Sequence, residues 1–186
     1  MEAWRLVRNR HTRRVYEALK RAGVTATRMY EYVAEGAPDP RDPPPDVAVT
    51  VHDPGDPVTL DHAHAAERRP DEFAVVARVD GAPVGHLFAS VDATHRIDPL
   101  ERSLEVDDAY VRRVWVDHSR RGEGVASALV TWGCRTTGGG RTTALVAVDN
   151  RPSRRLFAGN GFAARRAHTY VRLGPVALRR TTPVNV

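Results

Sequence analysis

The sequence has very few of the residues that build disulfides, metal clusters or membrane spans. It contains one cysteine, Cys134, which excludes an intrachain disulfide and a cysteine-based zinc site. No apolar stretch approaches the roughly 20 residues that a transmembrane helix needs, and the N-terminal residues lack the apolar core of a signal peptide. Every basic residue except Lys20 is an arginine. We therefore expect a cytoplasmic protein with neither a metal nor a membrane partner.

The composition is that of one folded domain with an uneven distribution of charge. The 186 residues are 41% hydrophobic and 27% charged, which suits a single packed core. The formal net charge of +5 divides into +4 over residues 1–36, −10 over 37–110 and +11 over 111–186. A basic chain can indicate nucleic-acid binding, but charges divided in this way also suit an anionic and a cationic ligand bound by different parts of the chain.

Hydrophobic periodicity and turn residues predict a mixed α/β sheet. A segment with five prolines, residues 38–45, reads as a stiff linker. It divides an N-terminal extension (1–45) from a core domain (46–175) and a tail (176–186). Residues 92–108 are either a loop or the extended tip of a hairpin. Helices are expected at 12–22, after Asp56-Pro57, at 125–136 and from Arg151, and strands at 29–34, 47–51, 73–79, 83–91, 110–116, 143–148 and 168–173.

The strongest local signal is a glycine-containing turn between a strand and a helix. The predicted strand ends at Asp117, and the segment Arg121-Gly122-Glu123-Gly124 leads directly into the next helix. Glycines permit a left-handed backbone and let another molecule approach the main chain. The free N–H groups at a helix N-terminus attract a phosphate or pyrophosphate. Neither a P-loop nor the dinucleotide-binding glycine motif fits this spacing.

This turn resembles the acyl-CoA signature of the GNAT superfamily of N-acetyltransferases, Arg/Gln-x-x-Gly-x-Gly/Ala. A second segment, VAVDNRPSRRLFAGNGF, resembles the fifth core strand of that family and the helix after it. The resemblance covers residues 46–175. It implies a mixed, mainly antiparallel sheet whose fourth and fifth core strands splay apart, and transfer of an acetyl group from acetyl-CoA to an amine. The cofactor-binding residues implied in this way are Val114, Trp115, Val116, Arg121, Gly122, Glu123, Gly124, Val125, Ala126, Asn150, Ser153 and Phe157.

The catalytic residues are less apparent, because the sequence departs from the family pattern. Phe157 stands where many relatives have a tyrosine that protonates the leaving thiolate, so Tyr170 or Tyr110 is a replacement candidate. The strand positions where relatives carry a glutamate base hold other residues here. Glu105, or Asp108, could act as the base through a water molecule. We take Tyr170 and Glu105 as the catalytic candidates.

Two alternatives to an N-acetyltransferase stay open. The missing tyrosine and glutamate would also suit a CoA-binding sensor or interaction module with little catalysis. A nucleic-acid-binding domain is less well supported, because basic and aromatic residues do not interleave. The expected partner is an amine on a small molecule or peptide, and the chain would be a monomer or a homodimer.

Overall fold

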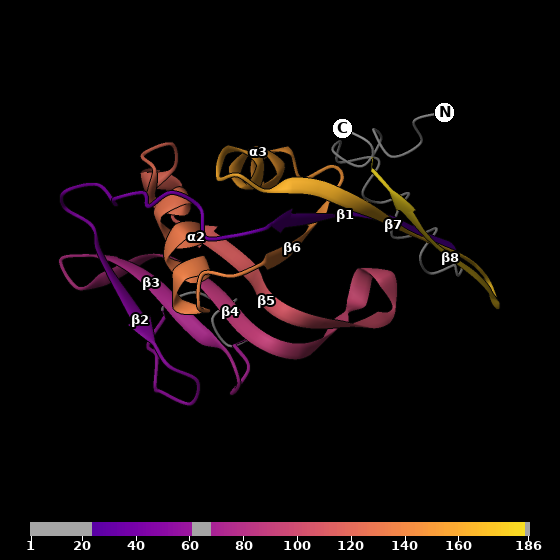
Figure 1. Cartoon of the computed structure of the whole chain (residues 1–186), viewed down its shortest axis with the longest axis horizontal. Helices are drawn as coiled ribbons and strands as arrows, with labels where there is room; N and C mark the ends of the chain where they lie inside the picture. The colour runs from indigo at the N-terminus through magenta and orange to yellow at the C-terminus, as the bar shows by residue number, and fades with distance from the viewer. Residues whose placement is uncertain (1–23, 61–67, 185–186) are drawn as a thin grey trace.

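A computed structural model describes residues 24–60 and 68–184, and they form an eight-stranded sheet (Figure 1). The strand order is β2-β3-β4-β5-β6-β1-β7-β8. All neighbouring pairs are antiparallel except β5 and β6, which are parallel. The predicted mixed, mainly antiparallel sheet is therefore confirmed. The strands are β1 (Val24–Ala34), β2 (Ala48–His52), β3 (Phe73–Val79), β4 (Ala82–Ile97), β5 (Arg102–Val116), β6 (Thr142–Ala147), β7 (Ala163–Leu173) and β8 (Val176–Pro183).

The region 92–108 is the extended tip of a hairpin and not a loop. Strands β4 and β5 continue pairing out to Ile97 and Arg102, and the short 3-10 helix η3 (Asp98–Leu100) joins them. The preceding hairpin, β3–β4, turns at Asp80 and Gly81, which both have the positive φ that its Asp-Gly sequence predicts. Alternating polar and apolar residues in the acidic middle of the chain thus form a long two-stranded arm.

Strand β1 corrects the predicted division of the chain at residue 45. It lies inside the sheet, hydrogen-bonded to β6 on one side and to β7 on the other. At the other end of the chain, β8 pairs with β7 along its whole length and forms the sheet edge. The sheet therefore includes residues from both the expected extension and the expected tail. The positions of β1 and β8 follow from their pairing with other strands of the sheet. The proline-rich segment after β1 had instead indicated a domain boundary.

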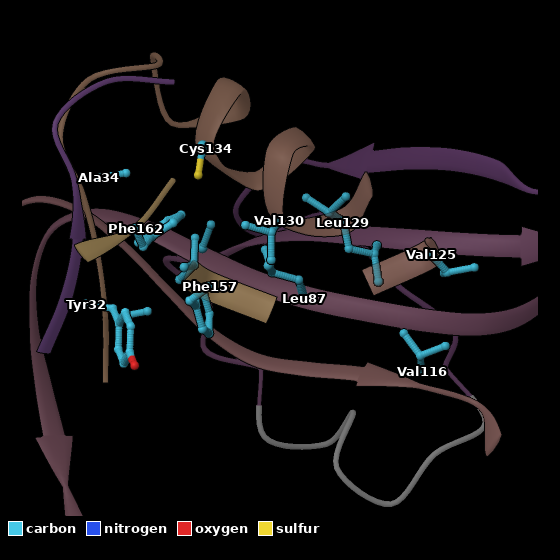
Figure 2. Packing of buried hydrophobic residues seen from close by; sticks show 14 of the residues in the cluster. Tyr32, Ala34, Leu87, Val116, Val125, Leu129, Val130, Cys134, Phe157 and Phe162 are labelled. Carbon is cyan, nitrogen blue, oxygen red and sulfur yellow. The ribbon is translucent and has the colours of Figure 1, made fainter. Parts of the chain in front are cut away.

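Among the described residues, two α-helices cover one face of the sheet (Figure 1). Helix α2 (Val125–Thr136) has the predicted bounds and packs on β3, β4 and β5, and α3 (Arg151–Gly159) packs near β7. Figure 2 shows the core beneath them, where Leu129 and Val130 of α2 meet Leu87 of β4. The approach at Gly133 is close, since a Cβ there would lie 2.6 Å from a Leu87 methyl carbon.

Other expected helices fall wholly or partly outside the described residues. The helix predicted at 12–22 lies entirely outside them. For the helix expected after Asp56-Pro57, residues 57–60 are not helical, and the following residues, 61–67, are not described. The face of the sheet away from α2 and α3, called the second face below, carries a smaller cluster around Tyr110 and Tyr170.

Candidate active site

A cleft opens where β5 and β6 separate. The two parallel strands pair only at Ala109 with Thr142 and at Tyr110 with Thr143. Beyond these pairs β5 continues to Val116 and β6 to Ala147, and a cavity of about 490 Å³ lies between them. The predicted splay of these strands is therefore present. A parallel pair that opens in this way leaves backbone groups that an extended ligand can pair with.

A bulge in β5 lies directly beside the cleft. His86 pairs with Trp115 and Phe88 with Arg112, so Arg113 and Val114 together stand opposite Leu87. Arg113 has a φ of 54°, a left-handed conformation that is uncommon for a residue with a side chain. Such bulges re-aim the backbone and interrupt pairing, often next to active sites. The bulge thus interrupts the pairing of β5 with β4 at Arg113 and Val114, beside the cleft, and the pairing resumes at Trp115 and Val116.

The glycine turn follows β5 and begins α2. Gly122 and Gly124 have φ values of 88° and 92°, and a Cβ at either position would meet no atom within 4 Å. Gly124 is the N-cap of α2 and supplies no side-chain cap, so the first-turn N–H groups have no side-chain acceptor. An exposed turn with this backbone is chemically suited to an anion such as a pyrophosphate.

The arginines of this turn are engaged in protein contacts. Arg121 donates from Nε to the Val116 carbonyl at 3.1 Å, which ties the turn to the end of β5. Arg120 pairs with Asp46 at 2.6 Å and with Glu123 at 3.2 Å. The ion pairs with Asp46 and Glu123 neutralise part of the charge of Arg120. In this conformation an anion at the turn would therefore contact mainly main-chain N–H groups.

Five of the predicted cofactor residues line one cavity. Asn150 caps α3 by accepting a hydrogen bond from the Ser153 amide at 3.2 Å, which fixes the start of that helix beside the cleft. Phe157 is also part of the core, and its ring lies 5.1 Å from Phe162, centroid to centroid (Figure 2). The remaining predicted residues, Val116 and those of the turn, continue from the β5 side of the cleft and do not line it. The five that line it are Val114, Trp115, Asn150, Ser153 and Phe157.

Neither predicted catalytic residue lines this cleft. Tyr170 is fully buried on the second face, and its hydroxyl donates to Glu101 at 2.5 Å. Burial, together with the Glu101 carboxylate, raises the pKa of Tyr170. Tyr170 therefore does not line the cleft, and its role as the acid that meets the thiolate stays a prediction. Glu105 is exposed and lines a different cavity on the second face. Tyr110 does line the cleft, and burial raises its pKa to about 12.

A buried ionic network supports the β5 side of the cleft. Arg112 lines the cleft and donates from Nε and Nη2 to the two carboxylate oxygens of Glu72 at 2.5 and 2.7 Å. Glu72 is fully buried. Nearby, His95 accepts from Arg69 at 2.8 Å and bonds Ser90 at 2.8 Å, and burial lowers its pKa. These contacts fix the strand beside the bulge.

A second cavity, of about 610 Å³, lies on the second face and contains a side-chain pair that the sequence analysis did not identify. Glu31 of β1 and His168 of β7 meet with Oε2 and Nε2 2.7 Å apart. His168 also contacts the Thr181 hydroxyl through Nδ1 at 3.1 Å. The two residues are far apart in sequence. The only sequence signal was a glutamate within the otherwise apolar strand Met29–Ala34.

The mixed sheet, the cleft between β5 and β6 and the glycine turn together are typical of an α/β acyltransferase fold. A family model described as the acetyltransferase (GNAT) family matches residues 26–162. Because the match spans most of the sequence, the chain belongs to the GNAT acetyltransferase family. The match begins within β1, in agreement with the place of that strand in the sheet.

Solved structures share this fold at low sequence identity. A GCN5-related N-acetyltransferase from Kribbella flavida aligns at 17% identity and TM-score 0.51, over 91% of this chain and 63% of that one. A putative GNAT-family acetyltransferase from Novosphingobium aromaticivorans aligns at 20% and TM-score 0.52, over 82% and 67%. A Drosophila protein aligns at 13% and TM-score 0.57, over 88% and 57%. The chain thus spans about three-fifths of the length of several neighbours. No curated protein matches it in sequence.

Two negative observations accompany the fold. Among residues 24–60 and 68–184, no helix is long and apolar enough to cross a membrane. Within the same residues, no three side chains of the metal-binding types lie close enough together to hold an ion.

Proposed function

We propose that the protein transfers an acetyl group from acetyl-CoA to an amine. The observation that carries the proposal is that β5, which lines the cleft between β5 and β6 up to Trp115, leads in the chain to the glycine turn at the start of α2. The main chain of Val114–Val116 would pair with the pantetheine arm, and the N–H groups from Arg121 to Ala126 would bind the pyrophosphate. The basic C-terminal part of the chain, +11 over residues 111–186, suits an anionic donor.

The reaction requires the amine nitrogen to attack the thioester carbonyl while the CoA thiolate leaves. An alkylammonium ion with a pKa near about 10 is mostly protonated at neutral pH, so a proton must be lost before attack. A thiolate has a conjugate-acid pKa near about 8.5 and leaves more readily than an alkoxide. Transfer therefore does not strictly need a tyrosine at the position of Phe157, although general acid catalysis is typically worth about 10²–10⁴-fold.

The alternative function is a CoA-binding module with little catalysis. Phe157 has no acidic proton, and Tyr170 does not line the cleft. Tyr110 does line it, but burial raises the pKa of Tyr110 to about 12, which makes it a weak acid. Of the features of the site, this one gives the strongest support to a protein that binds CoA without transferring the acetyl group.

Two measurements separate these functions. Isothermal titration with acetyl-CoA tests binding, and absence of heat at millimolar cofactor would refute both. Release of free thiol from acetyl-CoA with a panel of primary amines then tests catalysis. Amine-dependent thiol release identifies a transferase, whereas tight binding without release across the panel identifies the binding module.

A further inference from the structure

Glu31 is a nearly buried carboxylate in the middle of the sheet. Its neighbours in sequence, Tyr30 and Tyr32, face the core under the helices, so alternation places Glu31 on the second face. Only 12% of its side chain is exposed, and a buried charge is costly unless it is paired. His168 provides that pairing at Oε2, while Oε1 has only the Arg166 guanidinium at 3.7 Å among the described residues, beyond hydrogen-bond distance.

The surroundings of Glu31 connect it to the cleft. Glu31 lines the cavity on the second face together with Tyr110 and Leu145, and both of these residues also line the cleft between β5 and β6. Leu145 stands directly opposite Glu31 in the pairing of β1 with β6. Neighbouring strands lie about 5 Å apart. The carboxylate is therefore one strand away from the cleft, on the face opposite the helices.

We propose that Glu31 binds the ammonium group of the acceptor in this second cavity, with His168 as its positioning residue. This inference rests on the proposed acetyltransferase function and specifies the acceptor as an amine that is cationic in solution. The carboxylate would receive the ammonium at Oε1, while the His168 ring holds Oε2. Contact of Thr181 with the other ring nitrogen fixes the orientation of the imidazole.

The charges around Glu31 favour its ionised form. The hydrogen bond from His168 lowers the pKa of Glu31, and the nearby charges of Arg166 and Arg141 act in the same direction against the effect of burial. On the β5 side, Glu105, Asp107 and Asp108 also line the cavity, and Asp108 pairs with Arg141 at 3.4 Å. The cavity thus contains the Glu31 carboxylate at its inner wall and three further carboxylates along β5, and its other charged lining residues are Arg102, Arg141 and Arg166.

The pair could instead serve only to join β1 to β7. Those strands already pair along most of β1, from Val24 to Val33, so the sheet does not depend on one side-chain contact there. A purely structural pair would not respond to an added ammonium ion. The following experiment uses that difference.

The test titrates the full chain with butylammonium chloride, with butanol as the neutral isostere and sodium chloride as the salt control. The readout is the NMR signal of the His168 imidazole C–H, assigned with His168→Gln. We expect a saturable shift with butylammonium alone, and binding about ten- to a hundredfold weaker in Glu31→Gln, the range for one charge-assisted hydrogen bond. Glu35→Gln, at an exposed glutamate that follows the end of β1, is the matched control and should bind like the unmodified protein.

A second readout is kinetic. With acetyl-CoA and a cationic amine that supports turnover, Glu31→Gln should raise KM for the amine about tenfold or more and leave KM for acetyl-CoA unchanged. Thr181→Val should give a smaller effect in the same direction, and it serves as the test if Glu31→Gln does not fold by circular dichroism. A His168 signal that does not respond to butylammonium, or an unchanged amine KM, would overturn this proposal. Failure to bind acetyl-CoA would instead overturn the proposed function.

Discussion

Replacing Arg112 by methionine should destabilise the fold strongly, because it leaves the Glu72 carboxylate buried without its main partner. Glu72 is fully buried and accepts three hydrogen bonds, two from the Arg112 guanidinium and one from the Arg69 amide at 2.9 Å. Methionine keeps an apolar stem of similar reach but removes both guanidinium bonds and the positive charge. In the variant, the buried and charged Glu72 carboxylate would keep only the hydrogen bond from the Arg69 amide among these three.

The expected loss follows from these contacts. Two hydrogen bonds to a charged group are worth about 1.5–3 kcal/mol each, and removal of one partner from a buried ion pair typically costs about 3–5 kcal/mol. We therefore expect the free energy of unfolding to fall by about 3–5 kcal/mol. For a chain of this size each kcal/mol lowers Tm by about 2–4 °C, so Tm should fall by about 6–20 °C.

Urea denaturation followed by circular dichroism measures this change. The matched control is Arg96→Met, because Arg96 forms an exposed pair with Asp98 at 3.6 Å, and such pairs are worth about 0–1 kcal/mol. Glu72→Gln alone and combined with Arg112→Met completes a double-mutant cycle. A loss below about 1 kcal/mol for Arg112→Met, equal to that of the control, would refute the reasoning that the Glu72 charge depends on this guanidinium.

Three further results are expected. Gly124→Val should abolish measurable acetyl-CoA binding in calorimetry, because Gly124 has a φ of 92° and borders the proposed pyrophosphate cradle; unchanged affinity would exclude that cradle. Tyr170→Phe should cost about 1 kcal/mol of stability by losing the bond to Glu101 and leave kcat nearly unchanged, whereas a hundredfold loss of kcat would restore Tyr170 as the acid. The Cys134 thiol, whose pKa burial raises to about 11, should react with a disulfide reagent only after denaturation; rapid reaction of the folded protein would contradict its buried position.

Local patterns predicted the parts of the fold that depend on neighbouring residues. Helix α2 begins after Gly124 because that residue takes a left-handed turn and an apolar stripe follows it, and both features are visible in the sequence. The β3–β4 hairpin at Asp80-Gly81 is set in the same way. Part of the cleft lining was predictable as well, because Val114 and Asn150 lie beside two motifs whose order in the chain is visible.

Long-range pairing decided what local patterns could not. Strand β1 looked like part of an extension because prolines follow it, yet it is enclosed between β6 and β7. Tyr170 was a reasonable candidate from its position in the chain, but the sheet places its hydroxyl on Glu101 and away from the cleft.

The single cysteine excludes an intrachain disulfide and a cysteine-based zinc site. The division of charge along the chain suits an anionic donor and a cationic acceptor. The sequence by itself determined the glycine turn and much of the order of the elements, because these depend on backbone preferences within a few residues, and two of its motifs carried the resemblance to the family. Only the tertiary structure brought Glu31 against His168 and placed both in the cavity on the second face. Contacts between residues distant in the chain follow from sheet order and register, which local preferences do not specify.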